Sequence, residues 1–175
     1  SPAARMAERV YPRYQSQLQA SNAMDFGDLL LLTGQLLRHH PQVRQKYGRQ
    51  FHYVMVDEFQ DTNSVQYDLL KLLVQDHDNL MVVGDDDQSI YRWRGADVQN
   101  ILSFPQQFKD ATVVKLEQNY RSTNNILSAA NAVISKNSGR HPKTLRTDAE
   151  DGLEIGVALL PHSDDEAQVI AQTIA

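Results

Sequence analysis

Between residues 53 and 160 the chain alternates short apolar runs with polar stretches and with segments of helical periodicity. Each apolar run is long enough for one strand and precedes residues typical of a loop and then of a helix. This order predicts an α/β fold, in which helices cover both faces of a parallel sheet. The expected strands are residues 53–56, 80–83, 112–116 and 153–160, and the helices after them are 64–75, 98–104, 124–136 and one from Asp164 onward.

Three further helices are expected before the first strand. Residues 4–20 have a polar helical pattern, and residues 25–38 form an amphipathic one with a stripe of leucines. A short third helix should begin at Pro41, because proline suits a first helical turn, and end at Gly48, because glycine suits a helix end.

Composition excludes several classes of protein. The 175 residues contain no cysteine, which rules out disulfides, thiolate metal sites and a cysteine nucleophile, and the six histidines fall at no metal-ligand spacing. The longest apolar runs, such as residues 29–32, are far too short for a membrane span, and the first residues lack the apolar segment of a secretory signal. We therefore expect a cytoplasmic protein with no membrane partner.

Charge is distributed unevenly along the chain, whose formal net charge is -5. Residues 1–50 carry seven lysines and arginines against three acidic residues, whereas residues 51–118 carry five against twelve. The basic first third is compatible with a surface that faces a polyanion, and also with arginines that are merely solvated on helices. The acidic middle is more informative, because its carboxylates cluster where strands are expected to end.

Polar clusters follow the first three expected strands. They are DEFQD at 57–61, GDDDQSIYRWR at 84–94 and EQNYRS at 117–122. Ligands of parallel α/β sheets bind at the carboxyl ends of the strands. We therefore expect the three clusters to share one rim of the sheet, although they are far apart in the sequence.

The first cluster has the form of a Walker B element. In such an element one carboxylate holds Mg²⁺, and the next orients and deprotonates the water that attacks a γ-phosphate. Asp57 and Glu58 would take these roles. A strand followed by two acidic residues can also be a solvated turn, but Gln60 and Asp61 extend the polar run further than a strand exit needs.

The second cluster combines acidic with aromatic residues. Its three consecutive aspartates need a cation, a basic partner or water, and Gln88 after them could sense a phosphate, because its amide both donates and accepts. A charged turn is the alternative. Tyr91 and Trp93 alternate with arginines, as in loops that stack on unpaired bases and contact phosphates. The alternative is a buried tryptophan with an arginine over its ring.

The third cluster contains Tyr120 and Arg121 between an expected strand and an expected helix. An arginine there could stabilise the charge of a phosphoryl-transfer transition state, and a tyrosine could stack on a purine. A surface Tyr-Arg-Ser triplet has no such specificity on its own. Ser122 or Thr123 would cap the helix that follows.

Taken together, the clusters resemble a known family. VDEFQDTN, VGDDDQSIYRWRGAD and LEQNYRS, in this order, closely resemble motifs II, III and IV of the UvrD/Rep/PcrA branch of superfamily I DNA helicases. AMDFGDLL and NILSAANAVI resemble helices next to these motifs. The resemblance covers nearly all of the chain beyond about residue 20. It implies an ATP-dependent DNA helicase that translocates 3′ to 5′ on single-stranded DNA while two RecA-like lobes close and open around ATP.

The resemblance implies a role for each matching residue at an ATP site. Asp57, together with Glu58, would hold Mg²⁺, and Glu58 would be the general base. Gln88 would sense the γ-phosphate. Tyr120 would stack on adenine, and Arg121 would be the arginine finger.

The same resemblance implies a DNA site on the aromatic loop. Tyr91 and Trp93 would face single-stranded DNA, and Arg94 would contact either a DNA phosphate or the motif II carboxylates. Gln88 and Trp93 would then link nucleotide to base. Expected partners are ATP, single-stranded DNA, single/double-strand junctions and the remainder of a helicase chain, in DNA repair or replication.

One departure from the family affects what this chain can do. The sequence contains no G-x-x-x-x-G-K-[ST] loop to cradle phosphates. We therefore expect the central part of a longer helicase, with an incomplete RecA-like core and no activity of its own. Residues 1–49 would end an inserted subdomain of the first lobe, residues 50–117 would form the second half of its RecA-like core, and residues 118–175 would begin the second core.

Two alternatives remain open at the level of sequence. The chain could belong to a helicase-nuclease subunit, or to a helicase-like module that binds single strands without ATPase activity. The acidic pair, Gln88 and Arg121 argue against the loss of ATP chemistry. An upstream phosphate-binding loop would favour the helicase, and a downstream nuclease motif the helicase-nuclease.

Overall fold

The computed structural model describes residues 2–108 and 110–174. The chain divides into two compact units, Ser1–Val113 and Val114–Ala175. None of the helices in the described ranges is both long and apolar enough to cross a membrane.

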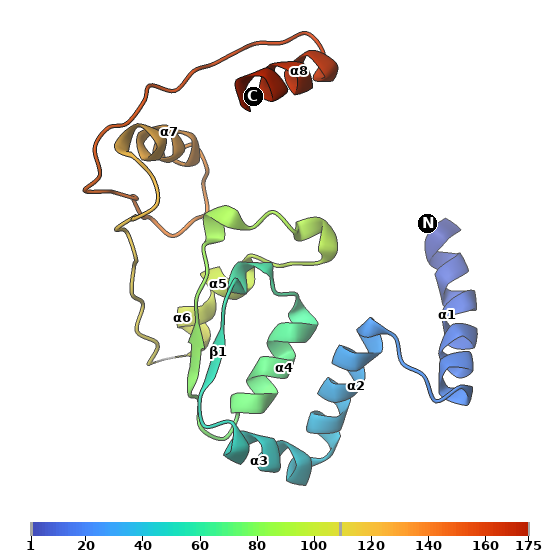
Figure 1. Ribbon diagram of the computed structural model, residues 1–175. Helices are drawn as coiled ribbons and strands as arrows, with labels where there is room; N and C mark the ends of the chain where they lie inside the picture. Colours follow the sequence, from blue (N-terminus) through green and yellow to red (C-terminus); the bar gives the residue numbers. More distant parts are fainter. Residues whose placement is uncertain (1, 109, 175) are drawn as a thin grey trace. The chain divides into compact units, whose positions relative to one another are not determined.

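Three helices open the first unit, as the sequence predicts: α1 (Pro2–Ala20), α2 (Phe26–His39) and α3 (Pro41–Gln50) (Figure 1). α2 begins with a capping box, in which the Asp28 N–H donates to Asp25 at 2.8 Å and the Asp25 N–H donates back to the buried Asp28 carboxylate at 3.1 Å. Two side chains of α1 bind the same carboxylates: Tyr14 donates to Asp25 at 2.8 Å and Gln15 donates to Asp28 at 3.0 Å. The Asp28 N–H and the Tyr14 hydroxyl lower the pKa of Asp25.

The prediction that α3 ends at Gly48 is wrong, because the helix continues to Gln50. Gly48 is buried, and a Cβ there would lie 3.4 Å from the carbonyl oxygen of Leu73. Leu73 belongs to α4 (Ser64–Val74). The glycine therefore serves the close approach of α3 to α4 rather than the end of a helix.

The first two expected strands form a parallel pair. β1 (Val54–Val56) and β2 (Leu80–Val82) align with Val54 opposite Leu80, and α4 connects them. The middle residue of each strand, Met55 and Met81, is exposed, while the residues on either side are half-buried. One face of this small sheet is therefore packed and the other presents methionine side chains.

The third and fourth expected strands are corrected by the structure. Neither 112–116 nor 153–160 is in a strand in the described part of the chain. A strand requires backbone hydrogen bonds to a neighbour along its length, and the backbone pairing of this segment that the structure describes begins only beyond residue 116. There Asn119 and Glu117 exchange backbone hydrogen bonds with Arg146, at 2.7 and 2.9 Å.

The expected helix at 98–104 is two short helices, α5 (Gln99–Leu102) and α6 (Phe104–Gln107). Pro105 stands in the first turn of α6 and has no N–H to continue α5. In the second unit, α7 (Asn124–Ile134) and α8 (Ser163–Ile174) lie close to their expected ranges. Thr123 occupies the N-cap position of α7 without a side-chain hydrogen bond.

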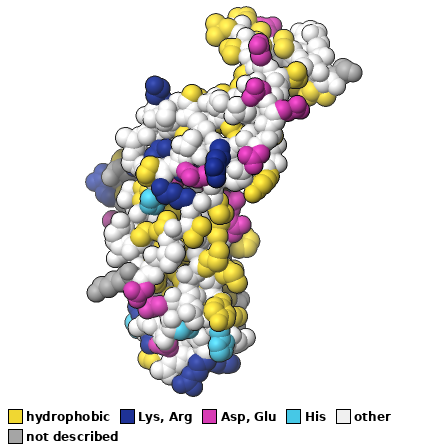
Figure 2. Space-filling model, turned by 90° about the vertical axis from the view of Figure 1, so that its left-hand side faces the viewer, with side chains coloured by type: hydrophobic (Ala, Val, Ile, Leu, Met, Phe, Trp, Pro, Cys, Tyr) yellow, Lys and Arg dark blue, Asp and Glu magenta, His cyan; other side chains and the backbone are white. Residues whose placement is uncertain are grey.

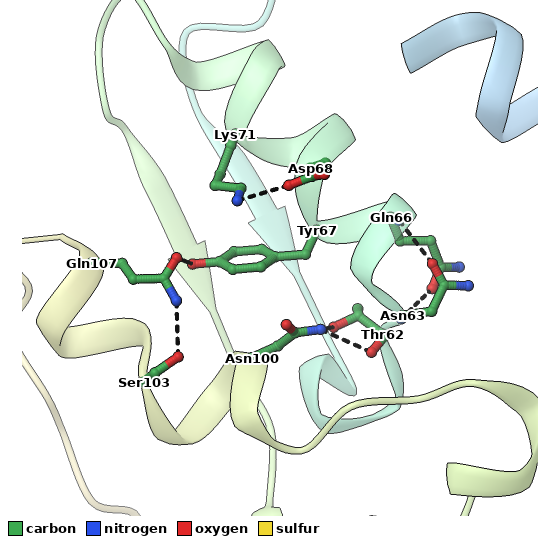
Figure 3. A network of polar contacts seen from close by, with 9 residues as sticks. All are labelled: Thr62, Asn63, Gln66, Tyr67, Asp68, Lys71, Asn100, Ser103 and Gln107. Carbon is green, nitrogen blue, oxygen red and sulfur yellow. Dashed lines mark hydrogen bonds and ion pairs between the residues drawn. The ribbon is translucent and has the colours of Figure 1, made fainter. Parts of the chain in front are cut away.

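The core of the first unit is aromatic. Phe59 is fully buried, and its ring meets those of Tyr67 and Phe104 edge to face, with centroids 5.4 and 5.7 Å away. The Tyr67 hydroxyl donates to Gln107 at 2.9 Å (Figure 3). Burial, and then the charge of Asp68, raises the pKa of Tyr67. The half-buried side chains around this core are Val56, Leu70, Leu80, Val82, Ile101, Phe108 and Ala111.

Hydrophobic side chains also reach the surface, where they gather in patches on the face shown in Figure 2. Separately, α2 carries exposed hydrophobic side chains, among them Phe26, which is 89% exposed. A chain of this kind therefore presents apolar surface in addition to a packed core.

Candidate functional site

The ends of β1 and β2 are joined beyond the strands themselves. The Val83 N–H donates to the Val56 carbonyl at 2.8 Å, and the Phe59 N–H donates to the Val83 carbonyl at 3.0 Å. The first two polar clusters, which follow these strands, therefore lie side by side at the carboxyl edge of the sheet. The third cluster belongs to the second unit and does not follow a strand there.

Glu58 has an unusual backbone conformation. Its φ of 50° and ψ of 41° lie in the left-handed region, which costs a non-glycine residue roughly 1–3 kcal/mol. The turn leads directly into the short helix η1 (Phe59–Asp61). The buried Phe59 ring holds this helix on the core. The packing of Phe59 therefore also fixes the strained turn at Glu58, the residue before it.

The two carboxylates of the acidic pair are both exposed. Asp57 Oδ1 accepts the Glu58 N–H at 2.8 Å, and Glu58 Oε2 accepts the side-chain amide of Gln60 at 2.8 Å. These bonds orient both groups while leaving them in contact with solvent.

This arrangement fits Mg²⁺, which prefers oxygen ligands and takes one or two carboxylates together with waters and substrate phosphates. Within residues 2–108 and 110–174 no group of three or more acidic or histidine side chains could hold a metal. A metal at Asp57 and Glu58 would therefore complete its shell with water and phosphate oxygens.

Gln60 is the buried polar residue of the site, with 1% of its surface exposed. Its Nε2 donates to Glu58, and its Oε1 accepts the backbone N–H of Asp85 at 3.0 Å. The sequence marks Gln60 as part of a polar run but gives no sign that it is buried. A structural role for Gly84 was also not predicted. A Cβ at this position would lie only 2.6 Å from Gln60 Oε1, so the site requires glycine here.

Gln88 is exposed at the end of the short helix η2 (Asp86–Gln88). Asp85 caps this helix: its Oδ1 accepts the Asp87 N–H at 3.0 Å, and its Oδ2 accepts the side-chain amide of Gln88 at 2.8 Å. The aspartate run is therefore organised internally by hydrogen bonds, and the Gln88 amide is held at the surface near the edge of the sheet.

The aromatic loop, residues 89–98, carries the short helix η3 (Arg92–Arg94). Trp93 is 75% exposed, so the alternative of a buried core tryptophan is wrong. The Arg94 guanidinium lies over both rings, 4.8 Å from the Tyr91 centroid and 4.7 Å from that of Trp93. Cation-π contacts thus hold the Arg94 side chain against the Tyr91 and Trp93 rings.

Both ends of the aromatic loop are bound to the segment that follows β1. At its start, Ser89 donates to the Gln60 carbonyl at 3.4 Å. At its end, the Asp97 N–H and the side-chain amide of the buried Asn100 each donate to the Thr62 carbonyl at 3.0 Å (Figure 3). No role for Thr62 or Asn100 was predicted, because neither residue belongs to a charged or aromatic pattern.

In the second unit, Tyr120 and Arg121 stand on a turn before α7. Asn119 Oδ1 accepts the N–H groups of Arg121 and Ser122, at 2.9 and 2.8 Å, which is an Asx turn. Tyr120 is 90% exposed, and Arg121 is exposed as well. Both side chains are available to a ligand.

Comparison with known proteins gives two matches to family models. The model of the UvrD/REP helicase N-terminal domain matches residues 1–109, and that of the UvrD-like helicase C-terminal domain matches residues 114–175. The chain is 49% identical over 173 residues to a probable DNA helicase II homolog of Rickettsia felis, which covers 99% of the chain and 26% of that protein.

Similar values are found for relatives in other bacteria. The ATP-dependent DNA helicase PcrA of Bacillus subtilis is 49% identical over 94% of the chain and 22% of its own length. The PcrA of Staphylococcus aureus strain Mu50 is 49% identical over 97% of the chain and 23% of its own length. The chain thus spans about a quarter of the length of the curated relatives it matches.

Proposed function

The chain belongs to the UvrD/Rep family of DNA helicases, and we propose that it is part of an ATP-dependent helicase that translocates 3′ to 5′ on single-stranded DNA. Such an enzyme unwinds duplexes at single/double-strand junctions in DNA repair or replication. The observation that carries the proposal is the hydrogen-bonded edge of the sheet, where an exposed carboxylate pair and Gln88 stand beside the aromatic loop.

The domain assignment is part of this proposal. Residues 1–49 are the end of an inserted subdomain of the first lobe, residues 50–117 are the second half of its RecA-like core, and residues 118–175 begin the second core. The helical character of the first range and the parallel strand pair of the second support it.

The ATP chemistry is proposed residue by residue. Bound Mg²⁺ would neutralise charge on the β- and γ-phosphates. Asp57 and Glu58 would hold the metal, and Glu58 would take a proton from the attacking water. Gln88 exchanges its bond with Asp85 for one with the γ-phosphate. Tyr120 stacks on the adenine, and Arg121 places positive charge against the transferring phosphoryl group.

The isolated 175-residue chain should show no ATPase activity. Its sequence lacks the loop whose N–H groups and lysine would cradle the phosphates, so the carboxylate pair has no positioned phosphate to act on. The measurement is phosphate release with Mg²⁺ and ATP, with and without single-stranded DNA. DNA-stimulated hydrolysis by this chain would contradict both the requirement for that loop and the assignment of the chain to a longer enzyme.

DNA binding is proposed for Tyr91, Trp93 and Arg94. The Trp93 ring is exposed and the Tyr91 ring is half-buried, with centroids 6.3 Å apart, and a base could stack on the exposed Trp93 ring. The Arg94 guanidinium beside the rings would supply positive charge to a backbone phosphate of such a strand.

Trp93→Ala in the full-length helicase should weaken single-strand binding by about 1–3 kcal/mol, the usual worth of one stacked base. Because the ring is exposed, the thermal midpoint should stay close to that of wild type. Fluorescence anisotropy with a labelled oligonucleotide and a thermal melt measure the two effects on one protein. Phe51→Ala, which removes another exposed ring from the same unit, is the control and should leave affinity unchanged. A lower midpoint with unchanged affinity per folded molecule would contradict the stacking role.

A further inference from the structure

The buried amide of Gln60 connects two parts of the candidate site. One of its partners, the Glu58 carboxylate, can only accept, and the other, the Asp85 N–H, can only donate. The orientation of the amide is therefore fixed by its partners: nitrogen toward Glu58 and oxygen toward Asp85. No polar atom of this side chain is left for solvent, which agrees with its 1% exposure.

The space around Gln60 admits this side chain and little else. A Cβ at Gly84 would meet Gln60 Oε1 at 2.6 Å, Ile101 Cδ1 at 2.9 Å and the Phe59 nitrogen at 3.1 Å. The absence of a side chain at Gly84 thus makes room for the amide oxygen. Asparagine at position 60 would be one methylene too short to span both partners, and glutamate would set a second carboxylate against Glu58.

The bonds continue from Gln60 toward the phosphate-sensing residue. Glu58 Oε2 binds Gln60, Gln60 binds the backbone of Asp85, and Asp85 Oδ2 binds the Gln88 amide. The Gln60 carbonyl also accepts Ser89, the first residue of the aromatic loop. One buried residue therefore contacts the proposed base, the loop that bears the sensor and the start of the loop that bears Trp93.

We propose that Gln60 is a positioning residue. It holds the Glu58 carboxylate in its orientation for water activation and fixes the position of this carboxylate relative to the Gln88 amide. This inference rests on the proposed function, because it assumes that Glu58 is the general base. Gln60 itself is buried and has no direct part in the proposed chemistry. It acts by fixing the carboxylate, whose backbone is already set by the left-handed turn.

Gln60→Met in the full-length helicase tests the proposal, because methionine has nearly the same length and removes both hydrogen bonds. Loss of a residue that orients a catalytic group typically lowers activity by about 10- to 100-fold. We expect kcat for single-strand-stimulated ATP hydrolysis to fall by that factor, with the KM for ATP changed less than about threefold. An unchanged kcat, or a loss confined to KM, would overturn the proposal.

Gln107→Met is the matched control. Gln107 also uses both amide atoms, accepting from Tyr67 and donating to Ser103 at 2.9 and 2.8 Å, but its partners stand on α4 and between α5 and α6 and not at the acidic pair (Figure 3). Its kcat should stay within about twofold of wild type. An equal loss in both variants would show a general structural effect and overturn the positioning role.

A second readout needs no nucleotide. Without the Gln60 oxygen, the Asp85 N–H loses its acceptor, so deuterium uptake by a peptide covering residues 84–88 should become at least about tenfold faster, whereas a peptide covering β1 should be unchanged. Equal uptake by wild type and Gln60→Met at residues 84–88 would contradict the proposed bond between Gln60 and Asp85.

Combination with Glu58→Gln separates the two proposals. If Gln60 acts through Glu58, Gln60→Met should reduce the residual turnover of Glu58→Gln by less than about threefold. Full additivity of the two losses would overturn the positioning role alone. Unchanged turnover in Glu58→Gln would instead overturn the assignment of the base, and hence the proposed function of this edge.

Discussion

Glu58→Gln in the full-length helicase should retain nucleotide binding and lose ATP turnover by about 10²- to 10⁴-fold, the usual contribution of a general base. A glutamine at this position keeps the shape of the side chain, and its carbonyl oxygen can still accept the amide of Gln60, which now binds Glu58 Oε2 at 2.8 Å. What it loses is the ability to take a proton. The measurements are kcat under saturating single-stranded DNA and the Kd of a fluorescent ATP analogue.

Glu8→Gln is a suitable control for this experiment. Glu8 is exposed on α1 and is not part of the site. Its substitution makes the same chemical change, from a carboxylate to an amide. Its turnover should equal that of wild type. If Glu58→Gln behaved like this control, Glu58 would not be the base, and the exposed acidic pair would be a solvated turn.

Phe59→Ala should destabilise the first unit by about 3–5 kcal/mol, the range typical of removing a buried aromatic ring. The ring is fully buried and meets both Tyr67 and Phe104 edge to face. A loss of this size is a large part of the stability of an ordinary domain. Urea unfolding of the 175-residue chain, followed by far-ultraviolet circular dichroism, measures it.

Two companion variants make this test decisive. Phe59→Leu keeps most of the apolar volume and should cost clearly less, so it provides a measurable protein even where alanine unfolds the unit. Phe26→Ala removes a ring that is 89% exposed and should change the free energy of unfolding by less than about 0.5 kcal/mol. Equal effects of Phe59→Ala and Phe26→Ala would show that Phe59 does not anchor the core.

The sequence predicted the helices well where a local signal exists. The leucine stripe predicted an amphipathic helix over residues 25–38, and α2 spans Phe26–His39. The proximity of the first two polar clusters also followed from a general rule, because the carboxyl ends of parallel strands share an edge.

The failures share a physical cause, which is dependence on a partner far away in the sequence. Residues 112–116 have a strand-like composition, but a strand exists only if another segment supplies its hydrogen bonds, and no local pattern shows whether it does. Gly48 ends no helix, because its role is set by Leu73 on another helix. Likewise Gln60 and Asn100 are polar residues whose burial depends on partners up to 38 positions away.

The attachment of the aromatic loop to Gln60, within η1, and to Thr62, directly after it, makes it an Ω-loop, a compact excursion whose two ends lie close together. The cost in chain entropy of closing such an excursion is met at its base, by Gln60 and Thr62 on one side and by Ser89, Asp97 and Asn100 on the other. The tip, with Tyr91 and Trp93, contributes little to that closure. Substitutions at the tip should therefore leave the base of the loop closed.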